Sequence, residues 1–122
     1  GSGNTAIGFQ ALQSSSLGTF NTVVGYTAGN LLTTGTNNTF LGYSAGSAIT
    51  TGGKNTIIDT YNGTTNLEAT IVLADGLNNI YLYATGSKVA INKQVTPNAT
   101  LDVNGNTIIT GSLTVTGNML II

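Results

Sequence analysis

Residues 21–29, NTVVGYTAG, decide the fold, because three related segments stand in register with them. NTAIGFQAL begins at Asn4, NTFLGYSAG at Asn38 and NTIID at Asn55, so each segment starts 17 residues after the one before. Self-similarity at a fixed period indicates stacked units, each too small to bury its own apolar face. The repeat is expected to end at Asp59, which stands where the earlier units carry a glycine.

Each unit contains an apolar, mostly β-branched pair between an Asn and a Gly, the pattern of a short strand with a turn at each end. Seventeen residues accommodate two or three such strands and their corners, one coil of a β-solenoid, with neighbouring coils about 4.8 Å apart. Recurrent Gly suits corners with positive φ, and recurrent Asn suits left-handed corners or hydrogen bonds to turn backbone. The residues assigned these repeat roles are Asn4, Asn21, Asn38, Asn55, Gly8, Gly25 and Gly42.

The two consecutive apolar positions of every unit predict an oligomer. Adjacent residues of a strand point to opposite faces, so one residue of each pair enters the coil and the other needs a partner. We assign the outward stripe to Val23, Phe40 and Ile57, whose exposure would forfeit about 1.5–3 kcal/mol for each side chain. Copies of the chain are therefore expected to pack along this stripe.

The C-terminal end has a second, shorter period of six residues. GNTIIT begins at Gly105, GSLTVT at Gly111 and GNMLII at Gly117, and ATLDVN from Ala99 fits the same phase as a fourth hexad, with Ala in place of Gly. The third and fifth positions are mostly apolar. Hexads also build left-handed β-helices from one chain, but with about 18 residues per turn these hexads would give little more than one turn. Three chains that each supply one hexad per turn would leave no unpaired edge. This pattern predicts an intertwined triple β-helix, with Leu113 and Val115 packed between chains.

Between the two arrays, short apolar runs alternate with turn residues, and Asp75-Gly76 is a hairpin signal. The expected fold is all-β and homotrimeric, without a helix. It consists of a β-solenoid or β-roll over residues 1–59, a short-stranded linker region over 60–98, and the triple β-helix shaft over 99–122. The apolar end at 119–122 indicates a piece of a longer protein.

Composition excludes several classes of function. The 122 residues include no His or Cys, so the chain lacks an imidazole base, a thiolate nucleophile and the ligands of ordinary zinc or copper sites. A net charge of −1 does not suit a partner rich in phosphates. No run of about 18 apolar residues is present. We therefore expect no catalytic activity, no cofactor or metal, no nucleic-acid partner and no membrane insertion.

The NTxxGxxAG units resemble the head repeats of trimeric bacterial adhesins and of related phage tail-fibre proteins, with a longer period than the commonest head repeat. Residues 89–106, VAINKQVTPNATLDVNGN, are similar to the linker that precedes a shaft and a self-cleaving chaperone in many phage fibres. Those linkers often carry Gly-Ile-Gly where this chain has Ala90-Ile91-Asn92. The resemblance implies a homotrimeric, elongated fibre on a virion tail or an extracellular surface, which attaches to a cell through a glycan or protein receptor.

Aromatic side chains are the candidates for contact with a glycan. Tyr81 and Tyr83 share a predicted strand face and, like Tyr61, lie outside the repeat, although burial in a core or interface is the commoner role of such residues. Three other aromatic residues recur at one repeat position, where they would either stack on sugar rings or, more commonly, pack against the next coil: Phe9, Tyr26 and Tyr43.

Two further functions stay open. An ice-binding solenoid would use the threonine ladder, which does not form repeated Thr-x-Thr rows: Thr5, Thr22, Thr39 and Thr56. A glycan-degrading enzyme would need two carboxylates about 5–10 Å apart, from Asp59, Glu68 and Asp75.

A calcium loop is disfavoured at the start of the hexads. Asp102, Asn104 and Asn106 alternate as in such a loop, but the glycine is misplaced and Leu113 stands where the loop requires Glu.

Overall fold

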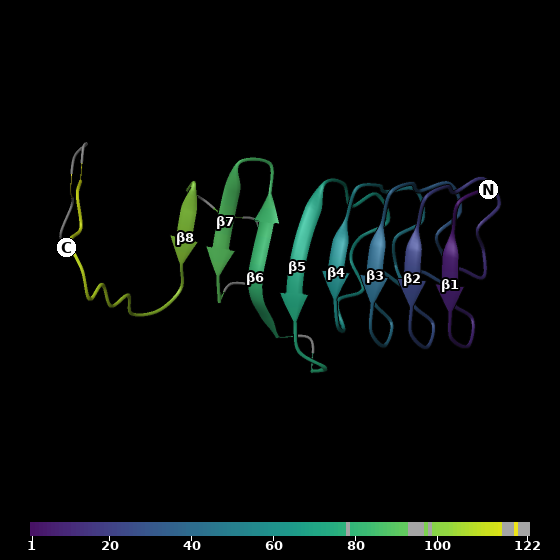
Figure 1. The fold of residues 1–122 in the computed structure, drawn as a ribbon, viewed down its shortest axis with the longest axis horizontal. Helices are drawn as coiled ribbons and strands as arrows, with labels where there is room; N and C mark the ends of the chain where they lie inside the picture. Colours follow the sequence, from purple (N-terminus) through teal and green to yellow (C-terminus); the bar gives the residue numbers. More distant parts are fainter. Residues whose placement is uncertain (78, 93–96, 98, 116–118, 120–122) are drawn as a thin grey trace.

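Each 17-residue unit forms one coil of a β-solenoid, with one short strand at the same place in every coil (Figure 1). The computed structural model describes residues 1–77, 79–92, 97, 99–115 and 119. The first four strands are β1 (Thr5–Ile7), β2 (Thr22–Val24), β3 (Thr39–Leu41) and β4 (Thr56–Ile58). They pair in parallel in the register of the repeat, and the rest of each coil consists of turns and bends. The expectation of two or three strands per coil is therefore wrong.

The glycine that follows each of the first three strands explains why these strands are so short. Gly8, Gly25 and Gly42 have φ values of 128°, 143° and 132°, a region that only glycine occupies readily. The coils also approach closely here, because a Cβ added to Gly25 would lie 2.1 Å from the carbonyl oxygen of Gly42. Steric exclusion thus requires glycine at this corner in the first three coils, whereas Asp59 turns the corner of the fourth with a φ of 69°.

Stacking continues past Asp59, where the sequence pattern predicts its end. The backbone N–H of Gly46 donates to Tyr61 O at 2.8 Å, and that of Thr50 donates to Thr65 O at 2.8 Å. This additional coil leads into β5 (Thr70–Ala74), which pairs in parallel with β4. The solenoid sheet therefore runs without a break across the boundary expected after residue 59.

Three further strands complete one sheet of eight strands in chain order. They are β6 (Ile80–Thr85) and β7 (Lys88–Ile91), both antiparallel to the strand before, and β8 (Leu101–Val103), parallel to β7. The prediction of an all-β fold is confirmed, and the hairpin expected at Asp75-Gly76 joins β5 to β6. Among the described residues no helix is long and apolar enough to cross a membrane.

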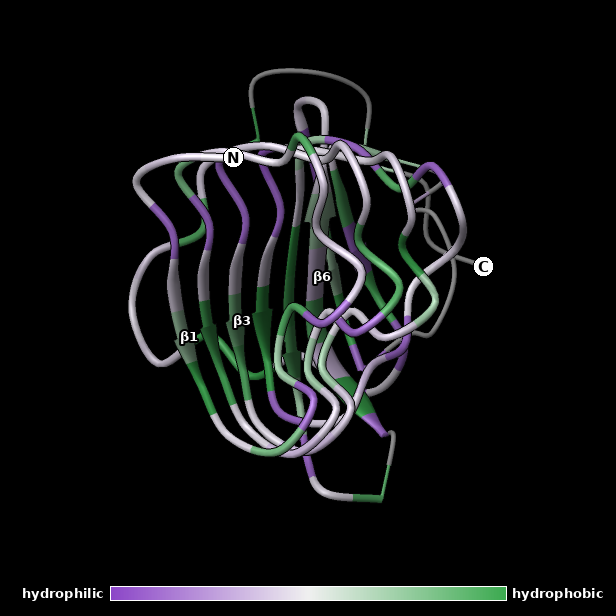
Figure 2. Ribbon diagram, turned by 90° about the vertical axis from the view of Figure 1, so that its right-hand side faces the viewer, coloured by the Kyte–Doolittle hydropathy of each residue, from purple (hydrophilic) through white to green (hydrophobic). Residues whose placement is uncertain are grey.

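The coil interior is filled by the middle residue of each strand. Val23, Phe40 and Ile57 are 0% exposed within the single chain. Leu32 and Ile49, also fully buried, belong to the same core cluster. Viewed along the stack, the coils superpose, with the strands along one wall and the turns around the rest (Figure 2). The core therefore runs as a continuous column through the stacked coils.

This burial overturns the assignment of Val23, Phe40 and Ile57 to packing between chains. Strand alternation requires that one residue of each apolar pair point inward, but it does not say which one. The asparagine before each strand sets the phase, because Asn21 is buried and the side chain two residues later must share its face. The outward residue is therefore the second of each pair, as at Val24 and Leu41.

The buried asparagines form a hydrogen-bonded ladder through the coils. Asn38 Nδ2 donates to Gly52 O at 3.0 Å and to Asn21 Oδ1 at 3.1 Å. Asn38 Oδ1 accepts hydrogen bonds from the backbone N–H and from Nδ2 of Asn55, both at 3.0 Å. Each amide thus satisfies turn backbone in its own coil and the asparagine of the next, which fixes the register between coils.

The variant Asn38→Ala is expected to destabilise the fold by about 2–3 kcal/mol, because Gly52 O and the Asn55 N–H lose their partners inside the protein. Urea unfolding followed by circular dichroism, at matched protein concentration, measures the change. Asn62→Ala is the control, because Asn62 is exposed. Equal midpoints for the two variants would contradict a structural role for the ladder.

After β8 the chain leaves the sheet, and residues 104–115 contain no strand. Leu113 and Val115, expected to pack between chains in a shaft, are exposed in the single chain. The last hexad, from Gly117, falls outside the described residues except for Met119, and so do 93–96 and 98 in the linker. The shaft prediction therefore stays a prediction.

Candidate functional site

An unbroken apolar row crosses the solvent-facing side of the sheet. Strand pairing places one outward side chain from each of the eight strands next to the one before. Seven strand spacings make this row about 33 Å long. We call it the outer row; it consists of Ile7, Val24, Leu41, Ile58, Leu73, Leu82, Ile91 and Val103.

A second row, parallel to the outer row, changes character halfway along the sheet. Over β1–β4 it consists of threonines, and over β5–β8 it is apolar. Neither row contains a charged residue, so covering this face would desolvate no charge, and the threonine hydroxyls are the polar groups that would need partners. The members of this second row are Thr5, Thr22, Thr39, Thr56, Ile71, Ala84, Val89 and Leu101.

The recurrent aromatic residues form a stacked and exposed ladder at the turn after each strand. The ring centroids of Phe9 and Tyr26 lie 5.3 Å apart, and those of Tyr26 and Tyr43 lie 5.6 Å apart, with interplanar angles of 20° and 7°. The three residues are 61%, 51% and 60% exposed. Each ring therefore packs against the next coil and still faces solvent. The ladder ends at Tyr43, because Thr60 takes the next position.

Tyr61, Tyr81 and Tyr83 do not form the common glycan surface expected of them. Tyr83 is only 7% exposed, and it meets Tyr61 edge to face at 6.2 Å. Burial, with the neighbouring Tyr83 as a smaller cause, raises the pKa of Tyr61 to about 12. Tyr81 alone is well exposed, at 56%. A register shift between Leu73 and Ala74 interrupts the alternation of inward and outward side chains in the hairpin, so Tyr83 points inward and Tyr81 points outward.

The carboxylate of Asp75 holds the turn between β5 and β6. It accepts hydrogen bonds from the Leu77 N–H at 2.9 Å, from the Asn79 N–H and Nδ2 at 3.0 Å each, and from the Tyr81 hydroxyl at 3.2 Å. These bonds, those from Asn79 foremost, hold the pKa of Asp75 below its usual value. A carboxyl group with a lowered pKa does not suit a general acid.

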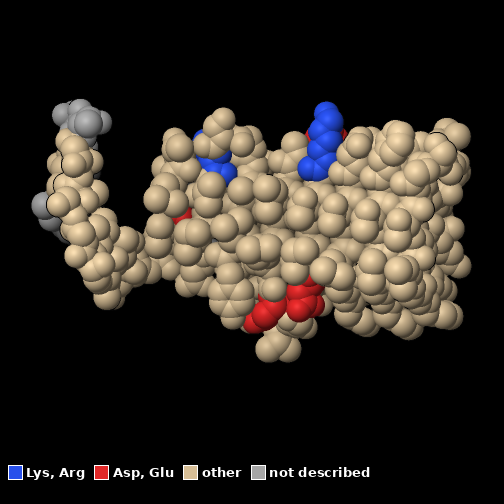
Figure 3. All heavy atoms as spheres, viewed as in Figure 1, with Lys and Arg blue, Asp and Glu red and all other residues tan. Residues whose placement is uncertain are grey.

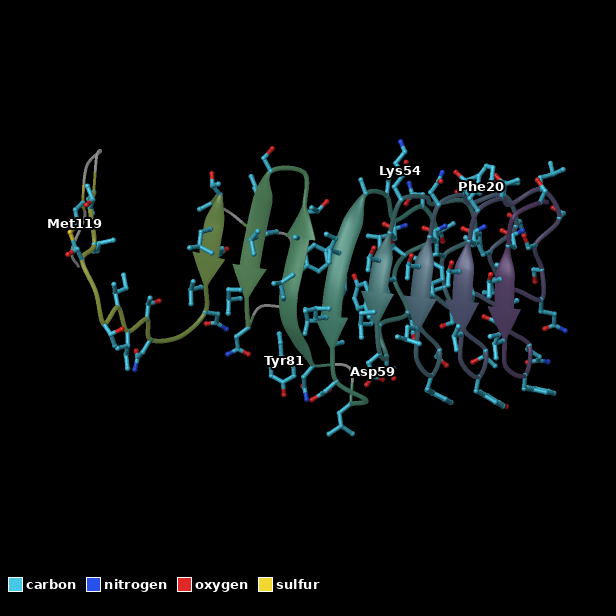
Figure 4. All side chains as sticks on the ribbon, in the orientation of Figure 1. Phe20, Lys54, Asp59, Tyr81 and Met119 are labelled. Carbon is cyan, nitrogen blue, oxygen red and sulfur yellow. The ribbon has the colours of Figure 1, made fainter. Side chains whose placement is uncertain are left out.

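Three of the four acidic residues are split between the two long edges of the molecule. Asp59 lies beside the Asp75 turn, because a Cβ on Gly76 would be 3.9 Å from Asp59 Oδ1. Glu68 instead pairs with Lys54 at 3.8 Å. Figure 4 shows Asp59 and Tyr81 at one long edge and Lys54 at the other, and Figure 3 shows acidic atoms gathered at the former edge. Glu68 is therefore not available to form a catalytic pair with either aspartate.

Asn104, which directly follows β8, exchanges hydrogen bonds with the backbone of Asn92, which directly follows β7. Asn104 Nδ2 donates to Asn92 O, and Asn92 Nδ2 donates to Asn104 O, both at 3.2 Å. Within the described ranges no three His, Cys, Asp or Glu residues cluster as metal ligands would. Asp102 lies within β8, and a backbone role is seen for Asn104.

The sequence pattern does not predict the outer row, because it assigns the packing between chains to Val23, Phe40 and Ile57, the residues next to it in each strand. The buried asparagine two positions earlier is the signal that identifies the inward residue of each apolar pair. No protein-family model, no curated protein and no solved structure matches the chain.

Proposed function

We propose that the chain is a structural and receptor-binding segment of an elongated trimeric fibre, a phage tail fibre or a surface adhesin that attaches to a host cell. The observation that carries this proposal is the outer row. Soluble monomers rarely leave a continuous apolar strip of this length in water. Leu41, for example, is 47% exposed in the middle of the sheet.

A second copy of the same chain is the partner that fits the outer row best. Its own row has the same strand spacing and the same absence of charge, so the two rows match over their whole length. The solenoid stack is itself elongated (Figure 1). Three such faces around an axis would cover one another, and the C-terminal hexads, which need three chains to close their turns, favour three copies over two.

The variant Leu41→Asp is expected to separate the chains and leave each coil folded. The new carboxylate would lie on the surface of a single chain but in the apolar contact of the trimer, at a cost of about 2 kcal/mol or more per chain. Analytical ultracentrifugation measures the mass, and circular dichroism measures the fold. Thr51→Asp, at an exposed position outside the strands, is the control. A trimer that tolerates Leu41→Asp would contradict this use of the outer row.

Attachment itself is tested by binding of the fluorescently labelled protein to a panel of bacterial strains in flow cytometry. Saturable binding to some strains, blocked by unlabelled protein, supports the proposal. If a protein of trimer mass bound to none of the strains, the segment would be structural only, and the proposed receptor binding would be contradicted.

Ice binding is the second candidate function, because the structure presents Thr5, Thr22 and Thr39 as exposed, regularly spaced members of an uncharged face. Ice binding and the trimeric fibre exclude each other, because the same face cannot contact both ice and two other chains. A monomer that shows thermal hysteresis would favour ice binding. A trimer without hysteresis favours the fibre.

A further inference from the structure

A rigid, exposed aromatic surface lies on the long edge that carries Asp59 and Tyr81 (Figure 4). Asp59 belongs to this edge because Gly42, which precedes Tyr43, packs against Asp59 Cα, and a Cβ on Gly42 would lie 2.7 Å from it. The next coil contacts the last ring residue directly, since Thr60 Oγ1 donates to Tyr43 O at 3.1 Å. We call this surface the aromatic edge; it consists of Phe9, Tyr26, Tyr43, Asp59, Asp75 and Tyr81.

The rings of the aromatic edge are stacked with an offset, as the steps of a staircase are, and do not overlap fully. Parallel rings in full face contact would lie about 3.5–4.0 Å apart, whereas the centroids here are 5.3 and 5.6 Å apart. The rings are therefore offset, and each leaves part of one face open. Their exposed fractions, all above one half, agree with this geometry.

The backbone holds the staircase in place before any ligand arrives. The Thr27 N–H donates to Phe9 O at 2.8 Å, the Ser44 N–H donates to Tyr26 O at 2.9 Å, and the Thr27 and Ser44 hydroxyls are 2.9 Å apart. These bonds fix the backbone that carries the rings, and each ring is further restricted by its stacked neighbour, which lowers the entropy cost of binding and favours affinity. The rings also lie in the turns after the strands, outside the outer row that the other chains would cover.

We infer that the aromatic edge binds a linear, neutral glycan. A pyranose ring has an apolar face of C–H groups, which suits the open part of an aromatic ring, and a rim of hydroxyls, which suits nearby acceptors and donors. Asp59, the carboxylate of Asp75 and the Tyr81 hydroxyl supply these polar groups where the staircase ends. The two carboxylates disfavour an anionic sugar, and Lys54 lies on the opposite edge.

This inference names the receptor class of the attachment role proposed above and rests on that role, but it does not depend on the number of chains. A protein partner would also use exposed aromatic residues. The open ring faces, bordered by hydrogen-bonding groups and without a described lysine beside them, favour the sugar.

The test measures binding of the whole chain to immobilised dextran, mannan, galactan, xylan and β-glucan, with hyaluronan as the anionic comparison, by surface plasmon resonance. Binding to at least one neutral polysaccharide, and weaker binding to hyaluronan, is expected. Tyr43→Ala should weaken the binding about tenfold or more. Tyr43→Phe should keep it, because the equivalent residue in the first coil is Phe9.

Leu31→Ala controls for the loss of an exposed apolar side chain elsewhere, and it should bind like the parent. The mass of every variant is measured alongside. No binding to any neutral polysaccharide, stronger binding to hyaluronan, or unchanged binding by Tyr43→Ala would each overturn the inference. A fall in mass for Tyr43→Ala would also overturn it, by assigning the edge to contact between copies. If the unmodified protein itself has the mass of one chain, the fibre proposal fails, and this result is distinct from a loss of glycan binding.

Discussion

Val23→Asp is expected to unfold the solenoid, with a loss of more than about 4 kcal/mol in the free energy of unfolding. Val23 is 0% exposed and lies between Ala6 and Phe40 in the paired strands. An aspartate here would place a charge in the apolar column with no cation near it. Thermal unfolding followed by circular dichroism measures the effect, and Thr19→Asp, outside the strands, is the control. Equal melting temperatures would contradict the coil interior described above.

The same variant should respond to pH in a defined direction. Burial raises the pKa of a carboxyl group above its unfolded value, so the charged form is the destabilising one. The penalty is therefore largest above this raised pKa, and it shrinks as the pH falls through it toward about 4, the pKa of the unfolded chain. A penalty that is the same at pH 4 and pH 7 would indicate that residue 23 reaches water.

Gly25→Ala is expected to be nearly as damaging, at about 3–5 kcal/mol. Gly25 has a φ of 143°, which a residue with a Cβ rarely adopts. The added methyl group would also lie 2.1 Å from Gly42 O, so the two coils would have to separate. Strain and steric overlap thus act together at one position.

Gly111→Ala is the matched control, because nothing lies within 4 Å of a Cβ at Gly111. It should change the urea midpoint little, whereas Gly25→Ala should lower it strongly. Equal urea midpoints for the two variants would contradict a close contact between coils at the glycine corner.

The sequence predicts the repeat and its register well, because both follow from spacing. A step of 17 residues from Asn21 to Asn38 must become a strand pairing of the same step, and the structure pairs Val23 with Phe40 accordingly. The all-β class and the hairpin at Asp75 follow from equally local signals. These features need no knowledge of what lies across the coil.

The side of the sheet on which each residue lies could not be predicted from the apolar pair alone. Val23 and Val24 are chemically identical, and only the burial of Asn21 decides which of them enters the coil. The bulge beyond Leu73 is a second example, because it moves Tyr83 into the core and Tyr81 out of it through a shift in pairing that leaves no mark on composition. Of the three tyrosines predicted outside the repeat, only Tyr81 therefore lies on the aromatic edge, together with Phe9, Tyr26 and Tyr43.

The mass of the chain in solution tests the central claim most directly. If the outer row is covered by sister chains, sedimentation equilibrium should give three times the chain mass of 12.4 kDa over the micromolar range. A mass of one chain at these concentrations would leave the outer row in water and would contradict the trimeric fibre.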